Sequence, residues 1–147
     1  MSLPEYASVY DNFDPARLEA DILEGRLDSG LNVCVEICDK WATDPERVAL
    51  YYEKDGGGSG KLTFAELKAA SARFANYLTS QGIGKGDRVA GLLPRSPEVL
   101  IVIAGALRAG AVYQPLFTAF GSGAIEYRLE KASTRLVVTD ATNHPKL

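Results

Sequence analysis

The stretch Gly86–Gly123, GDRVAGLLPRSPEVLIVIAGALRAGAVYQPLFTAFGSG, decides the fold of this chain. It predicts a strand, a helix and a second strand, followed by a loop that leads into another helix. Residues 88–93 are a short, mainly apolar run that is typical of a buried strand, and residues 111–114 are another. The helix between them, residues 97–109, is apolar on nearly all sides, so we expect it to pack deeply. Two buried strands joined by one helix predict a parallel pair with a right-handed crossover.

The residues that bound this helix support the same interpretation. Pro94 ends the first strand, and Ser96 is a favourable residue for the N-cap of the helix. Pro97 lies in the first turn, where the missing N–H of proline costs no hydrogen bond. Gly110 is expected to end the helix in the left-handed conformation, and Pro115 ends the second strand.

Residues 1–31 are expected to form an N-terminal leader, ahead of a main domain at residues 32–147. Within the leader, residues 6–13 are predicted to be irregular. The Asp-Pro pair at residues 14–15 is a typical helix start, and residues 16–24 have helical character.

A helix capped by Asn32 is expected to open the main domain. Val33, Ile37 and Trp41 recur at helical spacing and form one apolar stripe. Trp41 is therefore interpreted as a residue of the core or of a domain contact, not as a platform for a ligand.

A β-hairpin and a long helix are predicted next. Residues 48–53 are rich in β-forming residues, and residues 61–63 are interpreted as the return strand. The polar turn KDGGGSG, residues 54–60, joins them. The sequence TFAE at residues 63–66 is a capping box, which predicts a helix that extends to about Ser80.

Two glycine-rich segments resemble nucleotide-binding loops but lack their requirements. The phosphate loop of nucleoside triphosphatases needs glycine where Asp55 stands and serine or threonine where Leu62 stands. It also needs a helix directly after the loop. A carboxylate at the mouth of that loop would also repel phosphate, so the segment is interpreted as a hairpin turn. Gly82, Gly84 and Gly86 lack the spacing of the dinucleotide fingerprint and follow a helix instead of a strand.

The C-terminal part of the chain predicts one more helix and one more strand. The helix is expected at residues 123–132 with Ile125 and Leu129 directed inward, and the strand at residues 135–139. Residues 140–147 show no periodicity. Taken together, the elements predict an α/β fold in which a parallel sheet is flanked by helices and accompanied by an N-terminal β-hairpin.

The composition is that of a globular domain and excludes several classes of partner. Of the 147 residues, 46% are hydrophobic and 24% are charged, which is enough for one domain with its own core. The net charge is −3 and no basic cluster exceeds two residues, so nucleic-acid and acidic-membrane binding are not expected. No apolar run is long enough to span a membrane and no signal-peptide pattern is present, which predicts a cytoplasmic location.

The loop Phe117–Gly121 is the best candidate for a binding site. It follows the carboxyl end of a predicted parallel strand, which is where open α/β sheets bind ligands. Backbone amides in this loop could receive a polar group of a ligand. Alternatively, Phe117 and Phe120 could serve as core anchors that hold the loop down. The residues alone leave both interpretations open.

No catalytic residue and no metal site can be assigned from the sequence. His144 is the only histidine, and no nucleophile is tied to it by spacing. Cys34 and Cys38 lie four residues apart and are interpreted as core thiols, because a metal or redox pair would need further ligands and a different spacing.

Four segments taken in order resemble the N-terminal region of the AMP-forming acyl-CoA synthetases, in the acyl-adenylate-forming superfamily. They are RVALYYE (47–53), LTFAELKAASARFANYL (62–78), the long stretch 82–130 and STRLVVTD (133–140). The order and spacing of these segments carry the resemblance. The sequence AGAVYQPLFTAFG (109–121) looks like the acetyl-CoA and medium-chain synthetases.

The resemblance implies part of the large N-terminal domain of a ligase, of the kind that serves fatty acid metabolism. Such an enzyme uses ATP and Mg²⁺ to convert a carboxylic acid to an acyl-adenylate and then transfers the acyl group to CoA. It implies that Phe117, Thr118 and Ala119 lie beside CoA, although the family often has glycine in place of the last two. His144 and Lys146 stand where related enzymes place phosphate-binding arginines, and they are not assigned that role.

The segments of the family that bind ATP and carry the catalytic lysine have no counterpart in this sequence. The chain by itself is therefore expected to be inactive, to bind ATP, Mg²⁺ and CoA at most weakly, and to self-associate through an exposed sheet edge. A non-catalytic α/β module for nucleotide binding or for protein interaction, derived from such a synthetase, is the alternative.

Overall fold

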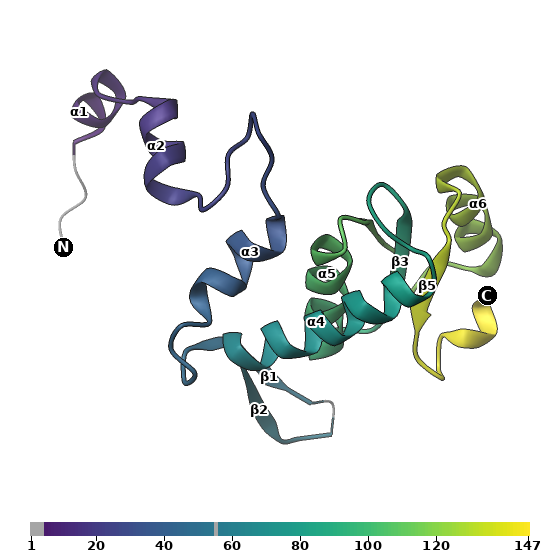
Figure 1. Ribbon diagram of the computed structural model, residues 1–147. Coiled ribbons are helices and arrows are strands. Elements are labelled where there is room, and N and C mark those ends of the chain that lie inside the picture. Colours follow the sequence, from purple (N-terminus) through teal and green to yellow (C-terminus); the bar gives the residue numbers. More distant parts are fainter. Residues whose placement is uncertain (1–4, 55) are drawn as a thin grey trace. The chain divides into compact units, whose positions relative to one another are not determined.

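The strand–helix–strand stretch at the centre of the sequence forms a parallel β–α–β unit in the computed structural model, which describes residues 5–54 and 56–147 (Figure 1). Strand β3 (Arg88–Leu92) is followed by helix α5 (Pro97–Arg108) and strand β4 (Val112–Pro115). Strand β5 (Leu136–Thr139) pairs with the other edge of β3, also in parallel, so the order among the described residues is β4–β3–β5. The predicted α/β fold with a parallel sheet is confirmed.

Helices cover both faces of this sheet. On one face, α5 and α4 (Phe64–Ser80) bury Leu78, Val89 and Ala106 in one cluster. On the other face, α6 (Ser122–Ala132) packs through Ile125 against Ala90, Leu92 and Leu116. Strand β3 supplies side chains to both clusters because successive residues of a strand point to opposite faces.

The C-terminal end of α5 is as predicted, whereas its N-terminal end lacks the predicted side-chain cap. Gly110 has φ +73°, and the next residue, Ala111, donates its N–H to the carbonyl of Ala106 at 2.9 Å, so the helix ends in a left-handed glycine as predicted. Ser96 has the extended backbone of an N-cap, but no side-chain capping bond to the helix amides is found in the described residues. Instead, the proximity of its hydroxyl to the carboxylate lowers the pKa of Glu98.

The hairpin and the capping box are confirmed. Strands β1 (Val48–Glu53) and β2 (Ser59–Thr63) pair antiparallel, and β2 begins two residues earlier than predicted. Gly56, Gly57 and Gly58 have φ between +89° and +99°, which gives the tight turn that glycine allows. Asp55 lies outside the described residues. Helix α4 begins at the capping box, in which Thr63 N–H donates to Glu66 Oε2 at 2.8 Å and Glu66 N–H to Thr63 Oγ1 at 3.2 Å.

The predicted apolar stripe at the start of the main domain is wrong. Helix α3 (Val33–Ile37) is short, because Cys38 leaves the helical conformation and a 3₁₀ turn, η1 (Asp39–Trp41), follows. Val33, Ile37 and Trp41 stay 41%, 44% and 36% exposed, whereas Cys34 and Cys38 are fully buried with Leu67 and Ala104. The compact thiols, and not the bulky stripe, face α4 and α5.

Trp41 therefore lies at the surface and not in the core. Its indole N–H donates to the carbonyl of Glu36 at 2.9 Å, and the guanidinium of Arg47 lies 4.5 Å from the ring centroid. The ring is held by a hydrogen bond and a cation–π contact.

The contacts divide the chain into two units, one of residues up to Leu31 and the other Asn32–Leu147. In the first unit, the residues predicted to be irregular form helix α1 (Tyr6–Asp11), and α2 (Pro15–Ile22) follows. Asp14 caps α2, as predicted, by accepting from the N–H of Ala16 at 3.0 Å. No side chain in α1 or α2 is buried, so these helices have no core among the described residues.

The C-terminal residues, which have no periodicity, form a turn with a buried polar group. A 3₁₀ turn, η2 (His144–Lys146), ends the chain, and Asn143 before it is 6% exposed. Among residues 5–54 and 56–147, no helix has the length and apolar character needed to cross a membrane.

Candidate functional site

The candidate loop lies where the sequence predicted it, at the carboxyl edge of the parallel sheet. Leu116 continues the pairing of β4 by donating its N–H to the carbonyl of Gly91 at 2.9 Å, and its side chain is buried. Residues 117–121 then leave the sheet, and α6 begins at Ser122. Because β3, β4 and β5 are parallel, the chain leaves all three strands at this same edge.

The two phenylalanines of the loop have different roles. A tight turn begins at Phe117, in which the N–H of Phe120 donates to the carbonyl of Phe117 at 3.0 Å. The rings meet edge to face with centroids 5.8 Å apart. Phe120 packs into the cluster beneath α6, with the Arg128 guanidinium 4.2 Å from its ring centroid, whereas Phe117 is 62% exposed. Phe120 is thus the core anchor, whereas Phe117 lies at the surface.

Thr118 and Ala119 lie between the two rings. Ala119 is exposed and Thr118 is half-buried. The carbonyl of Thr118 accepts a hydrogen bond from the ammonium of Lys146, which comes from the η2 turn. Thr118 also lines a cavity of about 670 Å³, whose other walls are Tyr52, Glu53, Lys54, Pro94, Arg95, Ser96, Pro97 and Glu98.

This cavity carries charges of both signs. The Ser96 hydroxyl, the Glu98 backbone N–H and the charge of Lys54 together hold the pKa of the Glu98 carboxyl below its usual range. The ionised carboxylate of Glu98 therefore occupies the N-terminus of its own helix, which makes that helix end unsuitable for a second anion. Arg95 is exposed at the same wall.

An apolar cavity of about 500 Å³ adjoins the polar one and shares five lining residues with it: Tyr52, Glu53, Pro94, Arg95 and Ser96. Its apolar wall consists of Leu50, Leu93, Val99, Leu100, Tyr113, Pro115 and Leu116. Burial raises the pKa of the Tyr113 phenol, so this group stays protonated at neutral pH. A β-carbon at Gly91 would overlap the Tyr113 hydroxyl, so the tyrosine ring would have to shift to admit any other residue there.

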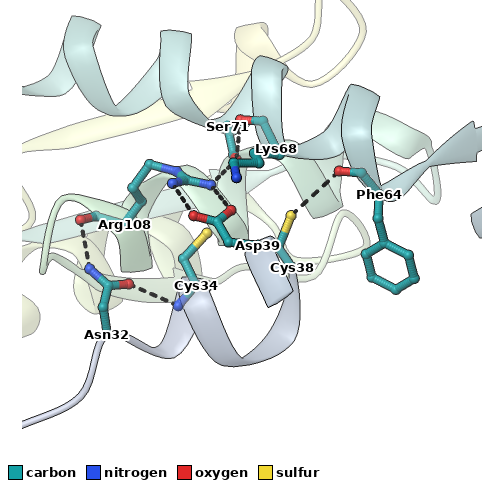
Figure 2. Close-up of polar contacts among 8 residues, drawn as sticks. All are labelled: Asn32, Cys34, Cys38, Asp39, Phe64, Lys68, Ser71 and Arg108. Carbon is teal, nitrogen blue, oxygen red and sulfur yellow. Dashed lines mark hydrogen bonds and ion pairs between the residues drawn. The ribbon is translucent and has the colours of Figure 1, made fainter. Parts of the chain in front are cut away.

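A second polar cluster of the main domain joins the N-cap of α3 with η1, α4 and α5 (Figure 2). Arg108 donates from Nη1 to Asp39 Oδ2 at 2.8 Å and from Nη2 to Asp39 Oδ1 at 2.6 Å. Nη2 also reaches the Ser71 hydroxyl at 3.1 Å, and Asn32 Nδ2 donates to the Arg108 carbonyl at 3.1 Å. We refer to Asn32, Asp39, Ser71 and Arg108 as the arginine clasp.

Three potential metal ligands, Cys34, Cys38 and Asp39, lie beside the clasp, and their contacts are those of core packing and of an ion pair. The ligand atoms of Cys34, Cys38 and Asp39 all lie within 4.8 Å of one another. Burial raises the pKa of both thiols, that of Cys38 to about 11, so they stay protonated, whereas the hydrogen bonds from Arg108 lower the pKa of Asp39. A metal bound here would have to displace both thiol protons and the two hydrogen bonds that Arg108 makes to the Asp39 carboxylate.

Sequence reasoning missed both the clasp and the lysine at the loop. Asp39 and Arg108 are 69 residues apart, and Thr118 and Lys146 are 28 apart, so no local pattern links them. For the lysine contact the sequence offered one signal: the spacing of Asp140 and Asn143 is typical of a side-chain-stabilised turn, which would bring Lys146 close to Asn143.

With this geometry established, the chain can be placed in a class of proteins. Residues 38–147 match the family model described as AMP-binding enzyme, so the chain belongs to that family. It is 41% identical over 142 residues to an acetyl-coenzyme A synthetase of Bacillus subtilis, covering 94% of this chain and 24% of the relative. It is 39% identical over 114 residues to an acetyl-coenzyme A synthetase of Streptomyces avermitilis, covering 76% of this chain and 18% of the relative.

Solved structures agree with these relatives. An acyl-CoA synthetase of Brucella canis matches with a TM-score of 0.92 at 46% identity, covering 98% of this chain and 26% of that one. A fatty acyl CoA synthetase of Mycobacterium tuberculosis matches with a TM-score of 0.68 at 30% identity, covering 78% of this chain and 22% of that one. The resemblance to AMP-forming synthetases is confirmed, and the chain spans about a quarter or less of the length of these relatives.

Proposed function

We propose that this chain is the N-terminal part of an AMP-forming acyl-CoA synthetase. In that reaction a carboxylic acid attacks ATP to form an acyl-adenylate and pyrophosphate, and the thiol of CoA then displaces AMP. The observation that carries the proposal is the agreement with the acyl-CoA synthetase of Brucella canis over 98% of this chain. Family membership over residues 38–147 supports it independently.

Within this reaction, the role proposed for the chain itself is binding of CoA by Phe117, Thr118 and Ala119. Support comes from the position of the loop at the carboxyl edge of the sheet and from the exposure of Phe117 and Ala119. The methyl group of Ala119 lies in solvent, so the absence of glycine at this position does not crowd the loop. The adjoining polar cavity offers room beside Thr118 for an extended ligand.

No described residue of the chain is assigned to ATP or to Mg²⁺. Magnesium prefers oxygen ligands, whereas two of the three clustered groups, Cys34 and Cys38, are thiols and the third, Asp39, is bonded to Arg108. The glycine-rich turn after β1 is followed by strand β2 and not by a helix, so it does not fit a phosphate loop. In this proposal ATP and Mg²⁺ bind to other parts of the full synthetase.

The proposed organisation has a leader at residues 1–31 and a partial synthetase domain at residues 32–147. We also propose a cytoplasmic location, because Cys34 and Cys38 are free thiols in the core, which suits a reducing compartment. Self-association of the chain is proposed because β4 and β5 each have an edge without a strand partner among the described residues, beside exposed Val112 and Phe117.

The decisive experiment compares the full-length gene product with the 147-residue chain. The full-length protein should catalyse carboxylate-dependent exchange between ATP and pyrophosphate and, with CoA added, form a thioester. The 147-residue chain should do neither and should show no heat of MgATP binding at micromolar concentration. Absence of exchange in the full-length protein with every acid of a short- to long-chain series would overturn the proposal. Micromolar MgATP binding by the 147-residue chain would favour a free-standing nucleotide-binding module.

A further inference from the structure

The centre of the candidate loop depends on a contact from outside the loop. Leu116 and Phe120 anchor its two ends in the cluster beneath α6. Between them, the Thr118 carbonyl is bonded to Lys146, 28 residues further along the chain. Lys146 is therefore the residue that ties the middle of the loop to the rest of the domain.

Lys146 is itself held in place by a chain of hydrogen bonds. Its ammonium also donates to Asn143 Oδ1 at 3.2 Å. Asn143 is buried, and both its backbone N–H and its Nδ2 donate to Asp140 Oδ1, at 2.7 and 2.9 Å. The amide of Asn143 is thus oriented with its nitrogen towards Asp140 and its oxygen towards Lys146. Thr139, next to Asp140, donates from its hydroxyl to the carbonyl of Leu92 at the end of β3.

The contact with Lys146 determines which way one peptide group faces. In a planar trans peptide the carbonyl of one residue and the N–H of the next point in opposite directions. Because the Thr118 carbonyl points to Lys146, the N–H of Ala119 points away from it. In the part of the chain that the structure describes, this N–H makes no hydrogen bond. It is available as a donor on the side of the loop opposite Lys146.

We propose that Lys146 is a positioning residue for CoA binding, which fixes the Thr118–Ala119 peptide so that the Ala119 N–H and Phe117 are presented together to the coenzyme. This inference rests on the proposed function of the loop. Lys146 acts through the carbonyl of Thr118 and does not touch the coenzyme. Its charge strengthens the bond to a neutral carbonyl, and the buried Asn143 keeps the ammonium in place.

The test uses the full-length synthetase and the substitution Lys146→Met, which removes the ammonium but keeps the length of the side chain. We expect the KM for CoA to rise about tenfold, as for the loss of one charge-assisted hydrogen bond, while ATP–pyrophosphate exchange changes less than about twofold. Lys146→Arg, which keeps a cationic donor, should recover most of the loss. Lys131→Met removes an exposed lysine of α6 and is the matched control.

Dephospho-CoA separates positioning from direct contact with a phosphate. A positioning lysine predicts the same fold-increase in KM for CoA and for dephospho-CoA. If the increase vanishes with dephospho-CoA, Lys146 binds the coenzyme directly and the inference is wrong. An unchanged KM for CoA in Lys146→Met would also overturn it.

A second variant tests the chain of hydrogen bonds and guards against misfolding of the first. Asn143→Leu should raise the KM for CoA in the same way, and the double variant with Lys146→Met should lose less than the product of the two single effects. Independent, multiplicative effects would contradict the inference. A parent enzyme without exchange or thioester activity would instead refute the proposed function, so the two failures are distinguishable.

Discussion

Two cations of the main domain, Arg108 and Lys146, show how the partner of a charge decides its role. Arg108 is matched by a carboxylate, which it contacts with both terminal nitrogens. Lys146 has neutral oxygen partners, those of Thr118 and Asn143. The first arrangement neutralises a largely buried charge and holds helices together, whereas the second orients a peptide group without neutralising anything. The arginine clasp is therefore expected to govern stability, and the lysine to govern the geometry of the loop.

The largest effect is expected from breaking the clasp. Arg108→Ala leaves the mostly buried Asp39 without its cation, and we expect the free energy of unfolding to fall by about 3 kcal/mol. Urea unfolding of the 147-residue chain measures this. Arg73→Ala, an exposed arginine on α4, is the matched control and should change stability by less than about 0.5 kcal/mol. Equal losses in both variants would mean that the clasp is not a stability element.

Acid should remove most of that difference. Hydrogen bonds from Arg108 lower the pKa of Asp39, so its stabilising contribution is complete above the pKa of an unfolded aspartate, about 3.9. The contribution is lost as the pH falls through the lower pKa of the folded state. The gap in unfolding free energy between the parent and Arg108→Ala should therefore be constant from pH 7 to 5 and shrink below about pH 4. A gap that does not change down to pH 3 would show that the effect of Arg108 is packing and not charge.

On the loop side the expected effect is smaller and confined to function. Ala119→Trp in the full-length enzyme places a bulky ring on the exposed side of the loop and should raise the KM for CoA about tenfold, which is about 1.4 kcal/mol. Exchange between ATP and pyrophosphate should be spared. Ala16→Trp, at an exposed position of α2, controls for an added tryptophan. If exchange falls as much as thioester formation does, the loop is structural and its assignment to CoA fails.

The smallest effect is expected from a third cation, Arg128. It lies 4.2 Å from the centroid of the Phe120 ring but is exposed on α6. An exposed cation–π contact contributes about 0.5–1 kcal/mol, so Arg128→Ala should lower the unfolding free energy by no more than that. Urea unfolding beside Arg108→Ala would rank the two arginines. A loss as large as that of Arg108→Ala would contradict the view that the partner of a cation decides its role.

The sequence predicted the elements whose determinants are local. The capping box at Thr63 and the left-handed Gly110 depend on neighbouring residues, so they could be inferred and are confirmed. The parallel sheet followed from the pattern of apolar runs and a connecting helix. The position of the loop at the sheet edge followed from the same pattern.

The features that sequence reasoning missed depend on contacts between distant residues. Periodicity selected Val33, Ile37 and Trp41 as the inner stripe, but the close approach of α3 to α4 and α5 leaves space for thiols instead. The short helix α1 is in the segment predicted to be irregular, and it has no core of its own to impose a periodic pattern. The clasp and the lysine contact join residues whose types carry no signal until the fold brings them together.

The clasp is also expected to affect the rate of unfolding. Asp39 and Arg108 are 69 residues apart, and the entropy cost of closing such a loop favours formation of their contact late in folding. A stabilising contact that is absent from the folding transition state slows unfolding and leaves the folding rate almost unchanged. We therefore expect Arg108→Ala to speed unfolding of the chain and to leave its folding rate almost unchanged.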